Sequence, residues 1–327
     1  MIDRSTLLKI ARDAATQRLA ARPSIVSAYL TGSVAANEPL LGDAADIDLI
    51  LIDSAPPAVT REVVRLTDQV ALDITHRDRA EYANPKVLRV HPWRGPELCE
   101  PYFLLDPHHF FELAQASARG QFHRPDFVAA RARAFVALAR DELHIGLLPG
   151  AEPSEPVTLG GLSRAMLCAA NAAISLTGFP GAGRRLVMKL ESAAQKLGRP
   201  DLHLAFLTLF GGNVAAWLND WNAAYRAGQS LTDELIHPAR RTIYERGFAA
   251  QAQSGRAADG VWLLLNTWQA LMHNIPTDSP HGDRWAAFLE SLHLANAEGL
   301  RAKIANACAY VDSVAEVVET WAEANGA

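Results

Sequence analysis

The chain has 327 residues, of which 49% are hydrophobic and 20% are charged, and its formal net charge is -5. This length and composition suit one large globular domain or two ordinary ones, each able to bury a core. The acidic balance argues against DNA or long RNA as the main partner, because a long polyanion needs a broad basic surface.

The first part of the chain, over residues 1–124, mixes helical and strand patterns. A helix is expected from about Ser5 to the residues before Pro23, since apolar side chains recur along one face. Apolar runs bounded by turn residues then predict strands, and two of them are close enough to form a hairpin across 67–69. The expected strands cover 24–30, 47–52, 62–66, 70–75 and 101–105, and a helix is expected to open at Asp106–Pro107.

From about Pro125 onward the strand signals vanish and helical periodicity takes over. The clearest stripe runs along 300–321, in steps of four and three residues, which indicates packing in a helical bundle. A proline-rich loop is expected over 148–156. The predicted fold is therefore an α+β domain over 1–124, with a mixed, twisted sheet and flanking helices, followed by an all-α helical bundle domain over 125–327.

Two carboxylates carry the strongest chemical signal. Asp46 and Asp48 begin the apolar strand pattern Ile47-Asp-Leu-Ile-Leu-Ile. Residues i and i+2 of a strand point to the same face, so both carboxylates project together. Two like charges at the start of a buried strand repel each other unless a cation lies between them. A hard divalent ion such as Mg²⁺ satisfies that requirement.

Thr31-Gly32-Ser33 lies at the end of an expected strand, and twelve residues separate it from Asp46. Glycine allows backbone N–H groups to approach a phosphate closely, and the serine hydroxyl adds a donor. A short helix starting at Ser33 would favour an anion at its N-terminus. We therefore expect Thr31, Gly32 and Ser33 to bind the phosphates of a nucleotide.

A third carboxylate, Asp73, interrupts the apolar run Val70-Ala-Leu-Asp-Ile. We expect it to hold a second metal ion and to accept the proton of an acceptor hydroxyl. Two ions can stabilise both the attacking and the leaving oxygen of an in-line displacement. The simpler interpretation, an ordinary Gly-Ser turn with loop-capping aspartates, leaves Asp73 unexplained. Asp43 also lies in the spacer, where it is expected to face solvent.

Together, Gly32-Ser33, Asp46-x-Asp48 and Asp73 resemble the motif of the DNA-polymerase-β-like nucleotidyltransferase superfamily. The resemblance covers roughly the first 120 residues. A small α+β domain followed by a helical one is also similar to the layout of the antibiotic-modifying adenylyltransferases. The resemblance implies catalytic and metal-binding roles for Asp46, Asp48 and Asp73, two Mg²⁺ ions, and an NTP co-substrate for which ATP is the first choice.

Weaker signals lie in the helical part. Arg184, Arg185 and Lys189 follow a glycine-rich segment that lacks the Gly-Lys-Ser/Thr ending of a P-loop. Arg185 and Lys189 are candidate phosphate contacts, although such charges more often form a solvated face. In the antibiotic-modifying enzymes a glutamate of the helical domain can serve as the base, which makes Glu191 a further candidate.

The expected function is transfer of a nucleoside monophosphate, AMP first, from an NTP to a hydroxyl acceptor with release of pyrophosphate. A small-molecule acceptor between the two domains is favoured over nucleic acid, since RNA would need a basic groove. The alternative is a regulatory or antitoxin-like homologue that acts on or through a protein partner. The sequence names neither the acceptor nor the oligomeric state.

The expected compartment is the cytoplasm. The three cysteines, Cys99, Cys168 and Cys308, fit no CxxC or zinc-ligand spacing, which indicates reduced thiols. The first residues lack the apolar segment of a signal peptide. No run approaches 18 apolar residues, so no membrane-spanning segment is expected.

Overall fold

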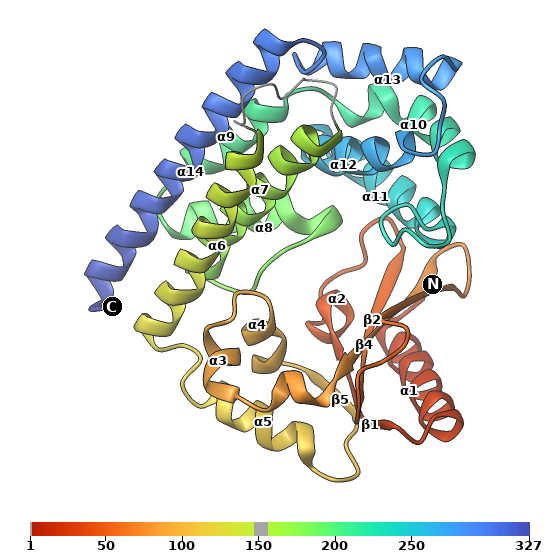
Figure 1. The fold of residues 1–327 in the computed structure, drawn as a ribbon, viewed down its shortest axis with the longest axis vertical. Helices are drawn as coiled ribbons and strands as arrows, with labels where there is room; N and C mark the ends of the chain where they lie inside the picture. The colour runs from red at the N-terminus through yellow and green to blue at the C-terminus, as the bar shows by residue number, and fades with distance from the viewer. Residues whose placement is uncertain (1, 147–155) are drawn as a thin grey trace. The chain divides into compact units, whose positions relative to one another are not determined.

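The structure is a computed structural model that describes residues 2–146 and 156–327 (Figure 1). The chain forms two compact units, Met1–Arg124 with Ala239–Arg246, and Pro125–Pro238 with Gly247–Ala327. The short segment Ala239–Arg246 thus groups with the first unit, and the domain boundary expected after residue 124 stays a prediction. The proline-rich loop expected over 148–156 lies outside the described residues, apart from Pro156, which begins a helix.

The first unit is built on a mixed five-stranded sheet of order β3-β4-β2-β1-β5. The central pair, β2 and β4, is parallel, and the other neighbours are antiparallel. The strands are β1 (Ile25–Thr31), β2 (Ala45–Asp53), β3 (Arg61–Arg65), β4 (Val70–Asp78) and β5 (Tyr102–Leu105).

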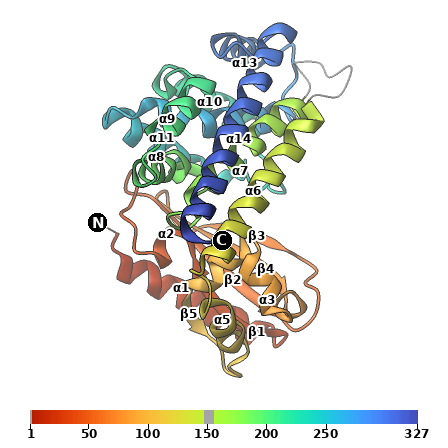
Figure 2. The ribbon, with the colours of Figure 1, turned by 90° about the vertical axis from the view of Figure 1, so that its left-hand side faces the viewer.

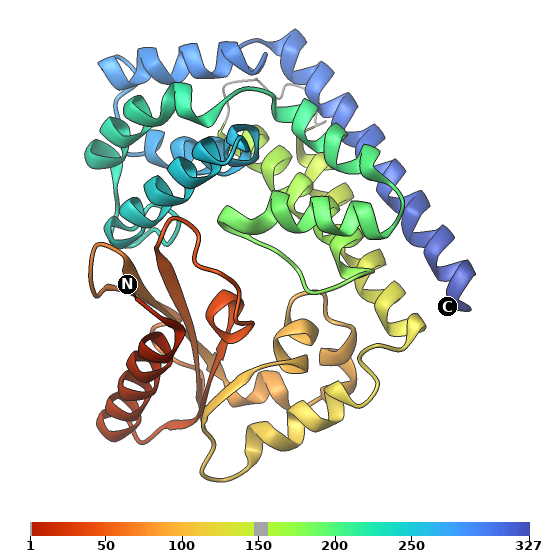
Figure 3. The ribbon, with the colours of Figure 1, turned by 180° about the vertical axis from the view of Figure 1, so that it is seen from behind.

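One face of the sheet is wholly apolar at its centre and is covered by helix α1 (Arg4–Ala21). The helix contributes Leu7, Ala11 and Ala15, spaced three to four residues apart, as one buried face. The strands contribute alternate residues such as Ile47, Leu49 and Leu51 of β2. The helix and this face of the sheet lie side by side in two views of the ribbon (Figures 1 and 3).

The opposite face of the sheet carries two separate apolar clusters. Near the carboxyl end of β2, Ile50 and Ile52 pack with aromatic and aliphatic side chains of the short helices that follow β4. Near the amino end, Ala44 and Ala71 pack with residues of the segment 239–246. Asp46 and Asp48 fall between these clusters on the same face, because they share the alternation of Ala44 and Ile50.

All five expected strands of the first unit are present, and β3 and β4 form the expected antiparallel hairpin. The helix expected at Asp106–Pro107 begins later, at Phe110 (α5, Phe110–Arg119). Asp106 still accepts hydrogen bonds from the backbone of Phe111 and Glu112, but His109 has a φ of 52°, which breaks the helical path. The short helix considered at Ser33 is present as α2 (Gly32–Ala35). The sequence patterns did not predict the other short helices, which are η1 (Arg79–Tyr82), α3 (Pro85–Val90) and α4 (Arg94–Cys99).

Among the described residues of the second unit, every element of regular secondary structure is a helix, as the loss of strand signals predicted. Its longest helix, α14, buries the expected stripe from Leu300 to Val318, while Trp321 at the end of that stripe is only partly covered. Helices α6 and α14 run side by side (Figure 2). The helices are α6 (Pro125–Gly146), α7 (Pro156–Ser175), η2 (Gly183–Arg185), α8 (Leu186–Lys196), α9 (Pro200–Phe210), α10 (Val214–Gly228), η3 (Pro238–Arg240), α11 (Arg241–Gln253), η4 (Ala257–Gly260), α12 (Val261–Met272), α13 (Pro280–Ser291) and α14 (Ala297–Asn325), with η3 and the start of α11 contributing to the first unit.

Among the described residues, no single helix has the length and apolar character needed to cross a membrane. One bent pair, α9 with α10, meets the length and composition criteria only when its two helices are taken together across a 51° bend.

The burial of the sheet core leads to a prediction about the free energy of unfolding. Leu49→Ala removes a fully buried side chain (0% exposed) from the central strand β2, whereas Leu113→Ala removes one from α5 that is 70% exposed. We expect the first substitution to lower the free energy of unfolding by about 2–5 kcal/mol and the second to change it by less than about 0.5 kcal/mol. Urea denaturation followed by circular dichroism measures both, and equal losses would contradict the position given to Leu49.

Candidate functional site

The candidate site lies where β2 and β4 begin to run side by side. In this parallel pair Asp48 is directly opposite Asp73, and Asp46 is opposite Ala71. Residues opposite each other in a ladder point to the same face of the sheet. Asp46, Asp48 and Asp73 therefore share one face, as the strand spacing predicted for the first two.

Gly32 lies against the carboxylate of Asp48. It follows β1, whose last residue, Thr31, is in register with Asp48. Gly32 has a φ of 70°, and a Cβ atom placed on it would overlap Oδ2 of Asp48. Only glycine permits both this backbone conformation and this approach. The Gly-Ser turn and the carboxylates, which are distant in sequence, are thus in direct contact.

Ser33 lies in the first turn of the short helix α2. Arg4 of α1 fixes this short helix, because its guanidinium donates to the carbonyl oxygens of Val34 and Ala35, each at 2.9 Å. Gly32 is exposed and Ser33 is partly exposed, so both can meet a ligand from solvent.

Asp73 is bound by two arginines. Arg61 of β3 donates a forked pair of hydrogen bonds to it, at 2.8 Å to Oδ1 and 2.7 Å to Oδ2. Arg240 lies in the segment 239–246, between Ala239 and Ile243 of the second apolar cluster, and also donates to Oδ2 of Asp73. A second nitrogen of Arg240 lies 4.0 Å from Oδ2 of Asp46. Asp73 is 3% exposed, so its carboxylate is shielded from water.

The pKa values of Asp48 and Asp73 are shifted in opposite directions. Burial, and then the charges of Asp73 and Asp46, raise the pKa of Asp48 to about 8. Burial acts on Asp73 in the same direction, but the hydrogen bonds from Arg61 and the charge of Arg240 outweigh it and leave the pKa of Asp73 below its ordinary value. Asp73 is therefore a stable anion, while the charged form of Asp48 is strained by its like-charged neighbours.

The fit of a divalent ion differs between these carboxylates. Asp46 and Asp48 supply hard oxygens on one strand face, beside the turn at Gly32, which is the donor chemistry that Mg²⁺ takes. Asp73 is engaged with two guanidinium groups in this conformation. Within the described residues, no group of three or more histidine, cysteine or acidic side chains is arranged to hold a metal ion. The geometry suits a two-carboxylate site better than a three-carboxylate one.

The other predicted site residues belong to the second unit. Lys189 donates to the carbonyl oxygen of Pro180 at 3.4 Å, and Arg185 ends the short helix η2. Glu191 pairs with Arg256 at 2.6 Å, and Arg256 also holds Asp259. Phosphate contact by Lys189 and Arg185 stays a prediction, as does a catalytic role for Glu191, which is here one side of an ion pair.

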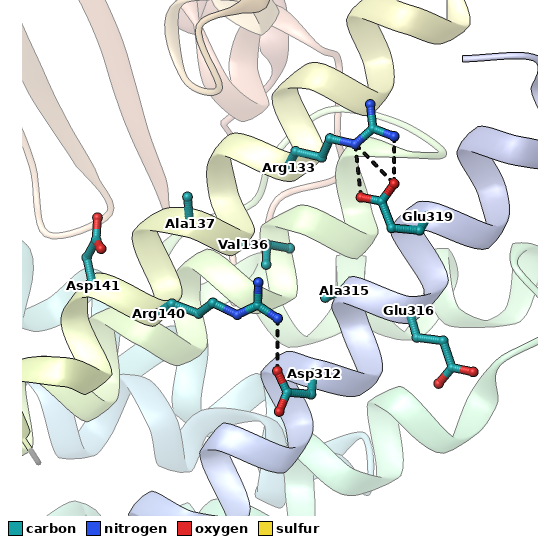
Figure 4. A pocket seen from close by; sticks show the side chains of 9 residues that line it. All are labelled: Arg133, Val136, Ala137, Arg140, Asp141, Asp312, Ala315, Glu316 and Glu319. Atoms are coloured by element: carbon teal, nitrogen blue, oxygen red, sulfur yellow. Dashed lines mark hydrogen bonds and ion pairs between the residues drawn. The ribbon is translucent and has the colours of Figure 1, made fainter.

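The second unit also has a cavity of about 590 Å³ between α6 and α14 (Figure 4). Its two arginines each face a carboxylate across the groove, Arg133 with Glu319 at 2.6 Å and Arg140 with Asp312 at 2.9 Å. These pairs join the two helices, and such exposed pairs contribute little stability. The groove brings together none of the predicted site residues.

Sequence reasoning missed both arginines of the site. The sequence gives only a weak indication of the role of Arg61. Arg61 lies two residues before Val63 on β3, so the two share a face of the sheet, and Val63 is directly opposite Asp73. The sequence gives no indication for Arg240, since it is 167 residues from Asp73 in a region of helical pattern. No protein-family model matches the chain, and no curated protein matches it either.

The raised pKa of Asp48 predicts how stability depends on pH. A folded-state pKa of about 8, above the ordinary 3.8, means that the folded protein holds this proton more tightly than the unfolded chain. Its contribution to stability is complete below about pH 4 and is lost as the pH rises towards 8. Asp48→Asn removes the carboxylate and should therefore abolish that loss.

In the metal-free protein at pH 8, we expect Asp48→Asn to raise the free energy of unfolding by roughly 1–3 kcal/mol relative to wild type, and by much less at pH 4. Chemical denaturation at both pH values measures this. Asp43→Asn, an exposed change of the same chemistry in the preceding loop, is the control. A gain of equal size at both pH values would show that repulsion of the Asp48 carboxylate is not the cause.

Proposed function

We propose that this protein is a Mg²⁺-dependent nucleotidyltransferase that moves a nucleoside monophosphate, AMP in the first instance, from an NTP to a hydroxyl acceptor. The observation that carries the proposal is the contact of Gly32 with Asp48, on the strand face that also bears Asp46. A Gly-Ser turn, which suits phosphate binding, thus lies beside two carboxylates, which suit metal binding. Neither feature alone is specific, and their convergence gives the proposal its weight.

The roles of the residues follow from their chemistry. Asp46 and Asp48 hold the metal, and the backbone of Gly32 with the hydroxyl of Ser33 binds the phosphates, with Thr31 preceding them. Bound Mg²⁺ supplies positive charge to the phosphate oxygens. Two ions are expected from the resemblance; the second would need Asp73.

The transfer reaction balances without any further reactant. The acceptor hydroxyl oxygen forms a bond to the α-phosphorus, and the bond from that phosphorus to the bridging oxygen of the β-phosphate breaks. Pyrophosphate leaves with the electron pair, and the hydroxyl proton passes to a carboxylate. Asp73 is the proposed acceptor of that proton. It can serve only after its arginines have withdrawn, because a carboxylate held by two guanidinium groups is a weak base.

The acceptor is proposed to be a small molecule. A net charge of -5 favours a neutral or cationic acceptor over a nucleic acid. A cationic antibiotic would fit this charge, although that suggestion rests on the similarity of layout to the antibiotic-modifying enzymes.

A second candidate function is favoured by the arginines on Asp73. A regulatory or antitoxin-like homologue, which works through a protein partner, has no need of a third free carboxylate. In that case the site would be silenced by its own arginines. The two candidates differ in whether the wild-type protein binds a nucleotide with metal.

Metal-dependent nucleotide binding tests the proposal directly. We expect calorimetry with a non-hydrolysable ATP analogue to show binding by wild type in Mg²⁺ and not in EDTA. Asp46→Asn and Asp48→Asn should each weaken that binding by about tenfold or more, since each removes a charged ligand. Asp43→Asn, in the loop that precedes β2 and exposed, should bind as wild type does. Failure of wild type to bind any of the four common NTPs would shift the proposal to the second candidate.

Gly32→Ala tests the contact on which the proposal rests. The added Cβ collides with the Asp48 carboxylate in addition to straining a backbone with a φ of 70°. Gly198→Ala, at a φ of 67° with open space around it, suffers the strain alone. We expect both variants to lose about 1 kcal/mol of stability from strain. Only Gly32→Ala should also lose analogue binding, by about tenfold or more; equal binding by both variants would contradict the proposed phosphate turn.

A further inference from the structure

We propose that Arg240 is a built-in cation of the carboxylate site, which competes with the metal and must leave Asp73 before that residue can act. This inference rests on the proposed function, since it concerns the regulation of the same site. The segment 239–246, which no motif in the sequence singled out, thereby has an autoinhibitory role.

The contacts of Arg240 carry the inference. Its side chain is 11% exposed, and its two terminal nitrogens reach towards different carboxylates, one to Oδ2 of Asp73 and the other to within 4.0 Å of Oδ2 of Asp46. A guanidinium in that position lies where a cation shared by Asp46 and Asp73 would lie. The protein and a metal ion thus draw on the same oxygens.

The segment around Arg240 is fixed by packing as well as by charge. Ala239 and Ile243, 3% and 1% exposed, pack against Ala44 and Ala71 on the carboxylate face of the sheet. These contacts flank Arg240 in sequence and set its position beside Asp73. Withdrawal of Arg240 therefore involves a movement of this small apolar contact or a change of the arginine rotamer.

The loop that precedes β2 meets the same segment. Gly42, with a φ of 66°, lies so close to Arg246 that a Cβ would overlap the carbonyl oxygen of that residue. The loop joining the Gly32 turn to Asp46 is thus in contact with the segment that carries Arg240. A ligand that orders this loop can therefore shift the position of the segment. By the reciprocity of coupled equilibria, the position of the segment must in turn change the affinity for that ligand.

Arg61 provides the internal comparison. It hydrogen-bonds the same carboxylate, Asp73, but it is part of the sheet, in strand β3. Arg240 reaches both Asp46 and Asp73 from a separate segment. A general effect of charge would make the two arginines equivalent, whereas a guanidinium that reaches both Asp46 and Asp73 competes directly with a cation for their oxygens, which makes Arg240 the stronger inhibitor.

The experiment measures binding of Mn²⁺ alone, from the electron paramagnetic resonance signal of the free ion, in wild type and in variants of the full chain. No nucleotide or acceptor is present, so turnover plays no part. The variants are Arg240→Gln, Arg240→Lys, Arg61→Gln and Arg199→Gln. Arg199 pairs with Asp201 at 2.8 Å in the second unit and controls for loss of one positive charge.

We expect Arg240→Gln to bind Mn²⁺ about tenfold more tightly than wild type, because the competing cation is gone. Arg240→Lys keeps the charge but cannot reach two carboxylates as a fork does, so it should show a smaller gain. Arg61→Gln should gain less than Arg240→Gln, and Arg199→Gln should match wild type. If Arg240→Gln does not fold, as judged by circular dichroism, the Arg240→Lys comparison decides.

Two results would overturn the inference while leaving the proposed function intact. One is Mn²⁺ affinity in Arg240→Gln no higher than in wild type, although wild type binds the ATP analogue with metal. The other is an equal gain in Arg61→Gln, which would reduce the effect to charge alone. Failure of every variant to bind Mn²⁺, with or without the analogue, would instead overturn the metal site and the inference with it.

Hydrogen exchange gives a measurement on the unmodified protein. We expect the amides of 239–246 to exchange faster when Mn²⁺ and the ATP analogue saturate the site, since Arg240 then loses Asp73 as its anchor. Unchanged exchange under saturating ligand would contradict the movement of this segment.

Discussion

The first unit depends on how it accommodates like charges on one face of its sheet. The register of β2 with β4 puts Asp48 directly opposite Asp73, and the strand alternation adds Asp46 on the same face. Such an arrangement is unfavourable by itself, because each buried carboxylate raises the free energy of the charged form of its neighbours. Arg61 and Arg240 offset that repulsion, Arg61 through hydrogen bonds to Asp73 and Arg240 through contacts with both Asp73 and Asp46.

The register that brings the carboxylates together is itself fixed by burial. On one face, alternate residues of β2 such as Ile47 and Leu49 pack under α1. On the other, Ala44 and Ile50 belong to separate apolar clusters on either side of the aspartates. A slip of one residue would turn Asp46 and Asp48 into the packed face. Hydrophobic packing on both faces therefore positions the charged groups.

The sequence predicted those parts of the site that local patterns encode. Asp46 and Asp48 could be placed on one face because a strand alternates every two residues, and the five strands followed from apolar runs. The contact of Gly32 with Asp48 needed the pairing of β1 with β2, which no local pattern states. The position of Arg240 depends on the return of the chain to the first unit after more than a hundred residues in the second unit. Its position follows from tertiary packing, so a motif search could not find it.

The two arginines differ in the carboxylates that they contact. The charges of both lower the pKa of Asp48, but burial and the charges of Asp73 and Asp46 outweigh them and keep that pKa raised to about 8. Arg61 already satisfies Asp73 with a forked pair of hydrogen bonds, yet Arg240 is directed to the same residue and towards Asp46. Arg240 therefore neutralises two carboxylates at once, and its charge also acts on Asp48. Under the proposal that Arg240 competes with a metal ion, Asp48, beside the Gly32 turn, is the carboxylate that a bound cation would relieve most.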